Sequence, residues 1–263
     1  MCRPMTPGMN PPLLPLWAVF AITVGVVLVS IFAGYAIGAG AKRRGEPPEG
    51  PIGSAVGAMM GLLAFMLAFT FGIASSRFDS RKQLLLDDVT TLMTAVRRTD
   101  LLPEPQRSQS RALLKRMVDR QVETLGDMGK LPQALAYREG IEDSLWALAT
   151  PLVRTQLNSP IGSLYVQSLN ALEEIQTKRV GVALQFRIPS NVWFGLLLVT
   201  VFAMSGVGFL FGIAGRGSLI AKTGLALAFA TVVLLIAQLD RVGGTEINHG
   251  PLLDLQRKLT LVP

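Results

Sequence analysis

The stretch from residue 51 to residue 98 constrains this chain more than any other part of the sequence. It begins with an uncharged apolar run at 51–76, which is long enough to cross a bilayer because about 20 apolar residues suffice for a helix. It continues into a charged segment, and neither Gly nor Pro occurs between Gly72 and Leu102. The sequence therefore predicts one long helix that crosses a membrane and continues into water.

The charged half of this helix keeps an apolar seam. Its members follow one another at spacings of seven, four, three and four residues, as on one face of a packed helix: Phe78, Leu85, Val89, Leu92 and Val96. We expect this seam to be buried against further helices that begin near Pro105 and Pro160.

Three other apolar runs and the composition set the fold class. Half of the residues are hydrophobic and 16% are charged, which is typical of a membrane protein. The runs at 16–40 and 191–215 are uncharged, and Lys222 is the only charged residue in the run at 218–239. We expect an all-α membrane protein with four transmembrane helices and a water-exposed helical domain inserted between the second and third spans. The expected divisions are an irregular leader (1–15), spans one and two (16–76), the helical domain (77–187), spans three and four (188–239), and a tail with a short amphipathic helix (240–263).

Proline and glycine mark the helix ends expected inside the helical domain. A helix should start near Pro105 and end at Gly126, and a second should run over 132–157 with a break or kink at Pro151. A third should run from Pro160 to about residue 185.

Charge around the spans bears on orientation. The two short loops hold Lys42, Arg43, Arg44 and Arg216, which favours these loops in the cytoplasm of a cell-membrane protein and the helical domain outside. Basic residues on the domain side, such as Arg81 and Lys178, argue against this, but a long domain can translocate regardless of its charge. Lys222 lies near a span end, where we expect it to extend to the interface as an anchor.

Catalytic and metal-binding motifs are missing from the sequence. Cys2 is the single cysteine and His249 the single histidine. Zinc sites and iron–sulfur clusters are therefore excluded, and no cofactor is expected. Adjacent acids, such as Asp87 and Asp88 or Glu173 and Glu174, point about 100° apart on a helix, which favours solvated faces over a catalytic pair. We expect no enzyme. We also expect no nucleic-acid partner, because the net charge of +7 is dispersed.

Charges at the membrane edges form a further candidate group. These are Arg77, Asp79, Asp240 and Arg241. The pair at 240–241 ends the fourth span, where an interfacial salt bridge is favoured over a functional gate.

Small and aromatic residues repeat every four positions in the spans. Glycines with this spacing let helices approach closely, and they occur in spans one to three: Gly34 and Gly38, Gly53, Gly57 and Gly61, and Gly208 and Gly212. Phe65, Phe69 and Ile73 continue the row on the second span. Spacing alone favours helix core or lipid contact for these three side chains.

The sequence around this row resembles a known family. Ala-Phe-Met-Leu-Ala-Phe at 64–69, followed by Ser-Ser-Arg-Phe at 75–78, looks like the second transmembrane helix of the bestrophin channels. More of the chain is similar to the bacterial bestrophin-like membrane proteins of unknown function. That similarity covers Leu-Leu-Pro-Glu-Pro at 101–105, Arg-Ala-Leu-Leu at 111–114, the Leu-Asp-Arg end of the last span and Pro-Leu-Leu-Asp-Leu at 251–255.

The resemblance implies a homo-oligomer, pentameric in bestrophins, whose second spans line an ion pore. The hydrophobic neck of those channels falls on Gly61, Phe65 and Phe69, and Gly61 departs from the pattern because it has no side chain. The acidic calcium-binding cluster of animal bestrophins is not found. The leading hypothesis is an ion channel or pore that conducts inorganic ions, with anions favoured by analogy. The alternative is a non-conducting oligomeric membrane scaffold or sensor that acts through its helical domain.

Overall fold

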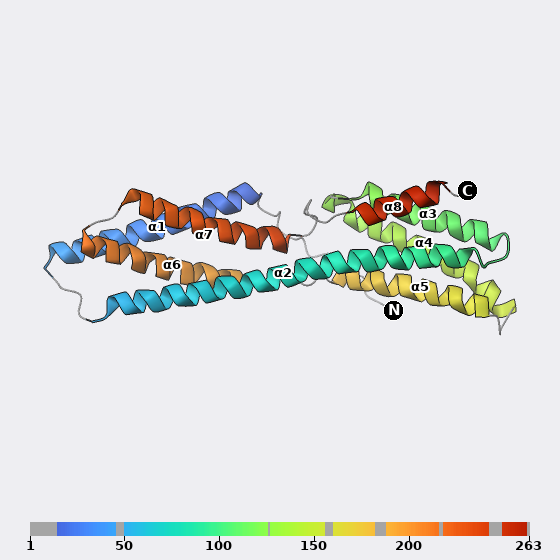
Figure 1. Ribbon diagram of the computed structural model, residues 1–263, viewed down its shortest axis with the longest axis horizontal. Coiled ribbons are helices and arrows are strands. Elements are labelled where there is room, and N and C mark those ends of the chain that lie inside the picture. Colours follow the sequence, from blue (N-terminus) through green and yellow to red (C-terminus); the bar gives the residue numbers. More distant parts are fainter. Residues whose placement is uncertain are drawn as a thin grey trace. The chain divides into compact units, whose positions relative to one another are not determined.

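The computed structural model describes residues 15–45, 50–125, 127–155, 160–181, 188–215, 218–241 and 249–261. Across these ranges the chain is helical and contains no strand, which confirms the all-α class. Residues 1–14 of the expected leader and the loop residue Arg216 lie outside the described residues. The elements are α1 (Leu16–Arg43), α2 (Ile52–Thr99), α3 (Gln106–Glu123), the short 3₁₀ helix η1 (Met128–Lys130), α4 (Leu131–Thr155), α5 (Pro160–Val180), α6 (Ser190–Ala214), α7 (Leu219–Asp240) and α8 (Gly250–Leu261) (Figure 1).

Four of these helices are long and apolar enough to cross a membrane: α1, α2, α6 and α7. The long helix predicted at 51–98 is confirmed, because α2 runs without interruption from residue 52 to residue 99. The chain divides into two compact units, and α2 contributes its first part to one and its second part to the other.

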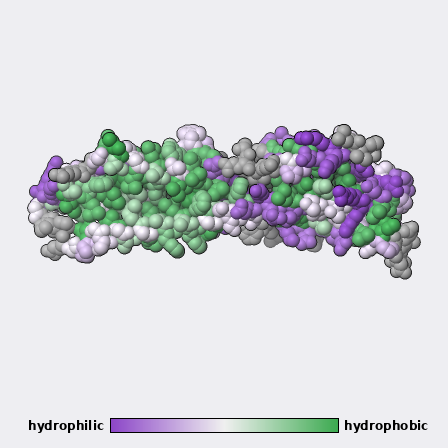
Figure 2. All heavy atoms as spheres, in the orientation of Figure 1, coloured by the Kyte–Doolittle hydropathy of each residue, from purple (hydrophilic) through white to green (hydrophobic). Residues whose placement is uncertain are grey.

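The first unit contains α1, the first part of α2, α6 and α7. Its visible surface is dominated by hydrophobic side chains (Figure 2). Its core draws at least one apolar side chain from each helix, including Ile31, Leu63, Met204 and Phe229.

Glycines on α1 and α6 face each other's backbones. A methyl group built at Gly34 would overlap the Ser205 carbonyl, and one built at Gly208 would overlap the Ile31 carbonyl. Gly38 and Gly212 lie equally close to the opposite backbone. Any side chain larger than hydrogen at these positions would push α1 and α6 apart.

Lys222 in α7 does not extend to an interface as expected. Its residue is only 4% exposed. Its Nζ lies 3.7 Å from the ring centroid of Tyr35 and 5.1 Å from that of Phe32, both on α1. The negative faces of the two rings attract the ammonium and compensate part of its lost hydration, so the lysine is held inside the unit.

The second unit contains the second part of α2, α3, η1, α4, α5 and α8. The predicted seam is confirmed in four of its five members: Leu85, Val89, Leu92 and Val96 are buried, and Phe78 is half-buried. The core around Leu92 includes side chains from α3 and α5, as expected from the starts at Pro105 and Pro160.

One feature of this unit differs from the sequence-based expectation, and a second adds a contact that the expectation did not include. Pro151 lies inside α4, which continues to Thr155 instead of breaking there. Core residues Leu145 and Ala149 hold the preceding turn in place. The C-terminal helix α8 adds Leu252, Leu255 and Leu259 to the same core, because its apolar face needs a partner surface.

Candidate functional site

One side of α2 within the first unit is packed. Val56, Leu63 and Thr70 are buried at seven-residue spacing. The Val56 side chain reaches the position where Gly206 of α6 would carry a Cβ, at 2.9 Å. This side therefore anchors α2 to the other spans.

The opposite side of α2 is exposed. Gly61 and Phe65 lie two residues either side of Leu63, about 160° away from it around the helix. Phe65 is 68% exposed and Phe69 is 60% exposed. Their rings stack with centroids 6.3 Å apart and an interplanar angle of 14°. We call Gly61, Phe65 and Phe69 the open face of α2.

Glycines next to these rings are equally uncovered. A methyl group built at Gly53, Gly57 or Gly61 would have no neighbour within 4 Å in the described chain, apart from its own helix. The four-residue glycine spacing of α2 is thus not used for packing against the described residues of this chain, unlike the glycines of α1 and α6. Exposed aromatic side chains beside a smooth glycine surface are suited to lipid or to a second protein chain.

Ile73 does not belong to the open face. It is half-buried and packs against the cluster of Ala74, Ile188 and Ile236. Each step of four residues turns the helix by about 40°, so three steps from Gly61 rotate Ile73 by about 120°. The row that looks continuous in sequence therefore winds from an open side to a packed side.

The charges at the span ends have different environments. The Asp240 carboxylate accepts a hydrogen bond from the Ile188 amide at 3.3 Å, which links the end of α7 to the residues that lead into α6. Arg77 and Arg241 are half-buried, and Asp79 is exposed.

A buried ion cluster lies in the second unit. Asp88 of α2 is fully buried and accepts hydrogen bonds from Arg138 of α4 at 3.0 Å and from Gln121 of α3 at 2.8 Å. Arg179 of α5 contacts the same carboxylate. Arg138 also donates to Glu142 at 3.0 Å. Four helices are thereby joined through one aspartate.

This cluster corrects the expectation that Asp87 and Asp88 form a solvated face. Asp87 is exposed, but Asp88 lies three residues after Leu85 and four before Leu92, on the buried seam. That position on the apolar face was the signal in the sequence. An acid there requires a buried cationic partner, which the sequence does not identify.

The cluster shifts several pKa values. Burial alone would raise the pKa of Asp88, but the charges of Arg179 and Arg138 outweigh it and hold this pKa below its usual value. Burial would lower the pKa of Arg138, but Asp88 and Glu142 raise it. For Glu142 burial dominates over the attraction of Arg138 and raises the pKa. Asp88 is therefore the most firmly ionised acid of the group.

Among the residues that the structure describes, His249 and the acidic residues do not gather into a metal site. His249 is half-buried rather than solvated, and burial together with the Arg179 charge lowers its pKa. Within the described ranges, no three His, Cys, Asp or Glu side chains gather closely enough to hold a metal ion.

Comparison with known proteins identifies the fold and the family. A family model for the bestrophin-like domain matches residues 21–242. The crystal structure of a bacterial bestrophin homologue from Klebsiella pneumoniae superposes with a TM-score of 0.65 at 14% identity, covering 93% of this chain and 96% of that one. A single-substitution variant of the Klebsiella pneumoniae homologue gives a TM-score of 0.64 at 13% identity, with coverages of 93% and 96%. No curated protein matches the sequence.

Proposed function

This chain belongs to the bestrophin-like family, and from that membership we propose that it forms a homo-oligomeric ion pore in the cell membrane, lined by the open face of α2. The observation that carries the proposal is the exposure of Phe65 and Phe69 on a span whose opposite side packs into the core of the first unit. Several copies arranged in a ring, five by resemblance to bestrophins, would bring these side chains to one axis.

The chemistry of the open face supports a hydrophobic gate. Residues 52–76 of α2 carry no charge, so a selectivity filter of charged side chains is excluded from this span. Rings of phenylalanine can close a pore by expelling water from a narrow apolar constriction. The net charge of +7 favours anions over cations near the protein.

The second unit is proposed to lie in water, and the helical domain that is inserted between spans two and three makes up most of it. Its apolar seam is already buried by α3, α4, α5 and α8, so it needs no lipid to cover it. The basic short loops favour the second unit outside the cell and the loops in the cytoplasm.

A labelling experiment tests this orientation. Ser108 in α3 is exposed, and Ser218 before α7 is exposed in a short loop. In a Cys2→Ser background, Ser108→Cys should react with an impermeant maleimide in intact cells, whereas Ser218→Cys should react only after lysis. The reverse pattern would place the second unit in the cytoplasm.

Truncating the aromatic gate tests conduction. Phe69→Ala should widen and wet the constriction, so that ion flux from liposomes containing the purified protein rises above wild type. Phe71→Ala is the matched control, because Phe71 is 41% exposed but lies about 160° from Phe69 around α2. Its flux should stay at the wild-type level.

The same variant separates a pore from the alternative, a non-conducting scaffold or sensor. In a scaffold, Phe69 would only pack against neighbouring copies, and its truncation would cost about 3–5 kcal/mol of stability on the soluble-core scale without opening a path. A correctly assembled Phe69→Ala protein that is as silent as wild type under chloride, potassium and sodium gradients would rule out the pore.

A further inference from the structure

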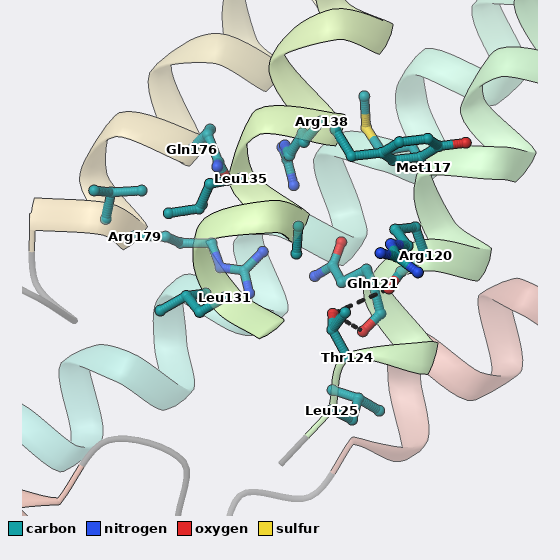
Figure 3. A pocket seen from close by; sticks show the side chains of 13 residues that line it. Met117, Arg120, Gln121, Thr124, Leu125, Leu131, Leu135, Arg138, Gln176 and Arg179 are labelled. Carbon is teal, nitrogen blue, oxygen red and sulfur yellow. Dashed lines mark hydrogen bonds between the residues drawn. The ribbon is translucent and has the colours of Figure 1, made fainter. Parts of the chain in front are cut away.

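A cavity of about 190 Å³ lies in the second unit among α3, α4 and α5. Part of its wall is apolar and includes Leu125, Leu131 and Leu135. The rest is polar, and Figure 3 shows the side chains of Arg138, Arg179 and Gln121 converging on the cavity from three helices. Arg120 lines it from α3.

Two arginines in the wall have nitrogen atoms left over after their ion pairs are made. The Arg138 side chain is only 8% exposed and uses Nε for Glu142 and Nη2 for Asp88 and the Leu172 carbonyl. Its Nη1 is buried and has no hydrogen-bond partner among the described residues. Arg120 likewise uses Nη1 for Glu123, at 3.1 Å, and leaves a buried Nε without a described acceptor.

Leaving such atoms unsatisfied is unfavourable, because a buried donor loses its hydrogen bonds to water without replacement. Both atoms are N–H donors on cationic groups, so an anionic oxygen acceptor is the matching partner. The acids already present do not fill this role, since they contact other nitrogens of the same arginines.

The charge around the cavity disfavours a ligand with more than one negative charge. Arg120, Arg138 and Arg179 are balanced by Asp88, Glu142 and Glu123. The carbonyl oxygen of Gln121 is also buried there without a partner among the described residues, and it would repel a second negative charge. The leucines that line the same cavity favour a ligand with a hydrocarbon body.

We propose that this cavity binds a small monocarboxylate with an apolar body. The carboxylate accepts hydrogen bonds from Nη1 of Arg138 and Nε of Arg120, and the hydrocarbon lies against Leu125, Leu131 and Leu135. The ligand joins α3 to α4 and stabilises the second unit. This site is separate from the open face of α2 and does not depend on conduction.

Hexanoate is a suitable probe, with the full-length protein in lipid nanodiscs. Binding of ¹³C-labelled hexanoate is followed by NMR, and thermal unfolding is followed in parallel. Wild type should bind saturably and unfold at a higher temperature with hexanoate present. Hexanol, which lacks the charge, and inorganic phosphate, which lacks the hydrocarbon, should compete poorly.

Three variants identify the cavity as the site. Leu135→Trp fills the cavity without removing a charge and should abolish saturable binding. Gln133→Trp adds the same bulk at an exposed position of α4 and should bind as wild type does. Arg120→Gln removes one charge-assisted donor and should weaken binding about ten- to a hundredfold.

Several results would overturn the site. If wild type shows no saturable hexanoate binding, or if Leu135→Trp binds hexanoate as well as wild type does, the cavity is not a binding site for hexanoate. If Arg120→Gln binds hexanoate with wild-type affinity, or if hexanol competes as well as hexanoate does, the cavity does not recognise an anion. If inorganic phosphate competes as well as hexanoate does, the site does not require a ligand with a hydrocarbon body. If Leu135→Trp fails to assemble, Arg120→Gln and the two competitors still decide the outcome.

Discussion

The Leu92→Asp variant should fail to accumulate as an assembled protein. Leu92 is fully buried in the core of the second unit, where side chains from α3, α4, α5 and α8 meet. Losing the leucine packing costs about 2–5 kcal/mol. Burying a polar group without a partner adds a penalty of roughly the same size. Together these approach the 5–15 kcal/mol that is typical of the total stability of a domain.

Purification yield and the size of the assembly in mild detergent measure the effect. Thr94→Asp is the matched control, since Thr94 is exposed two residues away on the same helix and should tolerate the charge. Wild-type yield and size for Leu92→Asp would mean that the seam is not buried.

The Asp88→Ala variant should lower the free energy of unfolding of the second unit by about 3–5 kcal/mol. Removing one partner of a buried ion pair leaves the other charge without compensation. Here Arg179 would lose the acid that it contacts, and Arg138 would keep only Glu142. Chemical unfolding followed by circular dichroism measures the change. Asp87→Ala, at the exposed neighbour, should stay within about 0.5 kcal/mol of wild type.

The effect of Asp88 should also depend on pH. Because folding lowers the pKa of this carboxyl from its usual 3.8, its contribution is fully present above that value. The contribution is lost as the pH falls further, through the folded-state pKa. The difference in stability between wild type and Asp88→Ala should therefore narrow on acidification below about pH 4. If the free energies of unfolding of the two proteins fell in parallel on acidification, Asp88 would not be ionised in the folded state.

Local sequence was sufficient for the spans and for the seam. An uncharged run at 16–40 predicts a membrane helix wherever its neighbours lie, and α1 covers Leu16–Arg43. The spacing of Leu85, Val89 and Leu92 likewise marks a buried face, because helical periodicity depends only on the chain itself. The family resemblance was also readable from short motifs.

Partners distant in sequence decided the buried charges. Asp88 meets Arg138, 50 residues away, and Arg179, 91 residues away. Lys222 lies over two aromatic rings of α1. A charged residue beside an apolar stretch can extend to water or be buried with a partner, and only the tertiary structure shows which environment is available.

The glycine spacing shows the same division between local and tertiary information. Four-residue repeats in α1, α2 and α6 look alike in sequence, since each predicts only that close approach is sterically allowed. In the folded chain Gly34 and Gly208 lie against a neighbouring backbone, whereas Gly57 and Gly61 have no neighbour among the described residues. The sequence determined where helices could approach closely. The tertiary structure decided which helices do approach closely. Whether a neighbouring helix covers a given glycine surface depends on how all four spans pack their apolar faces together.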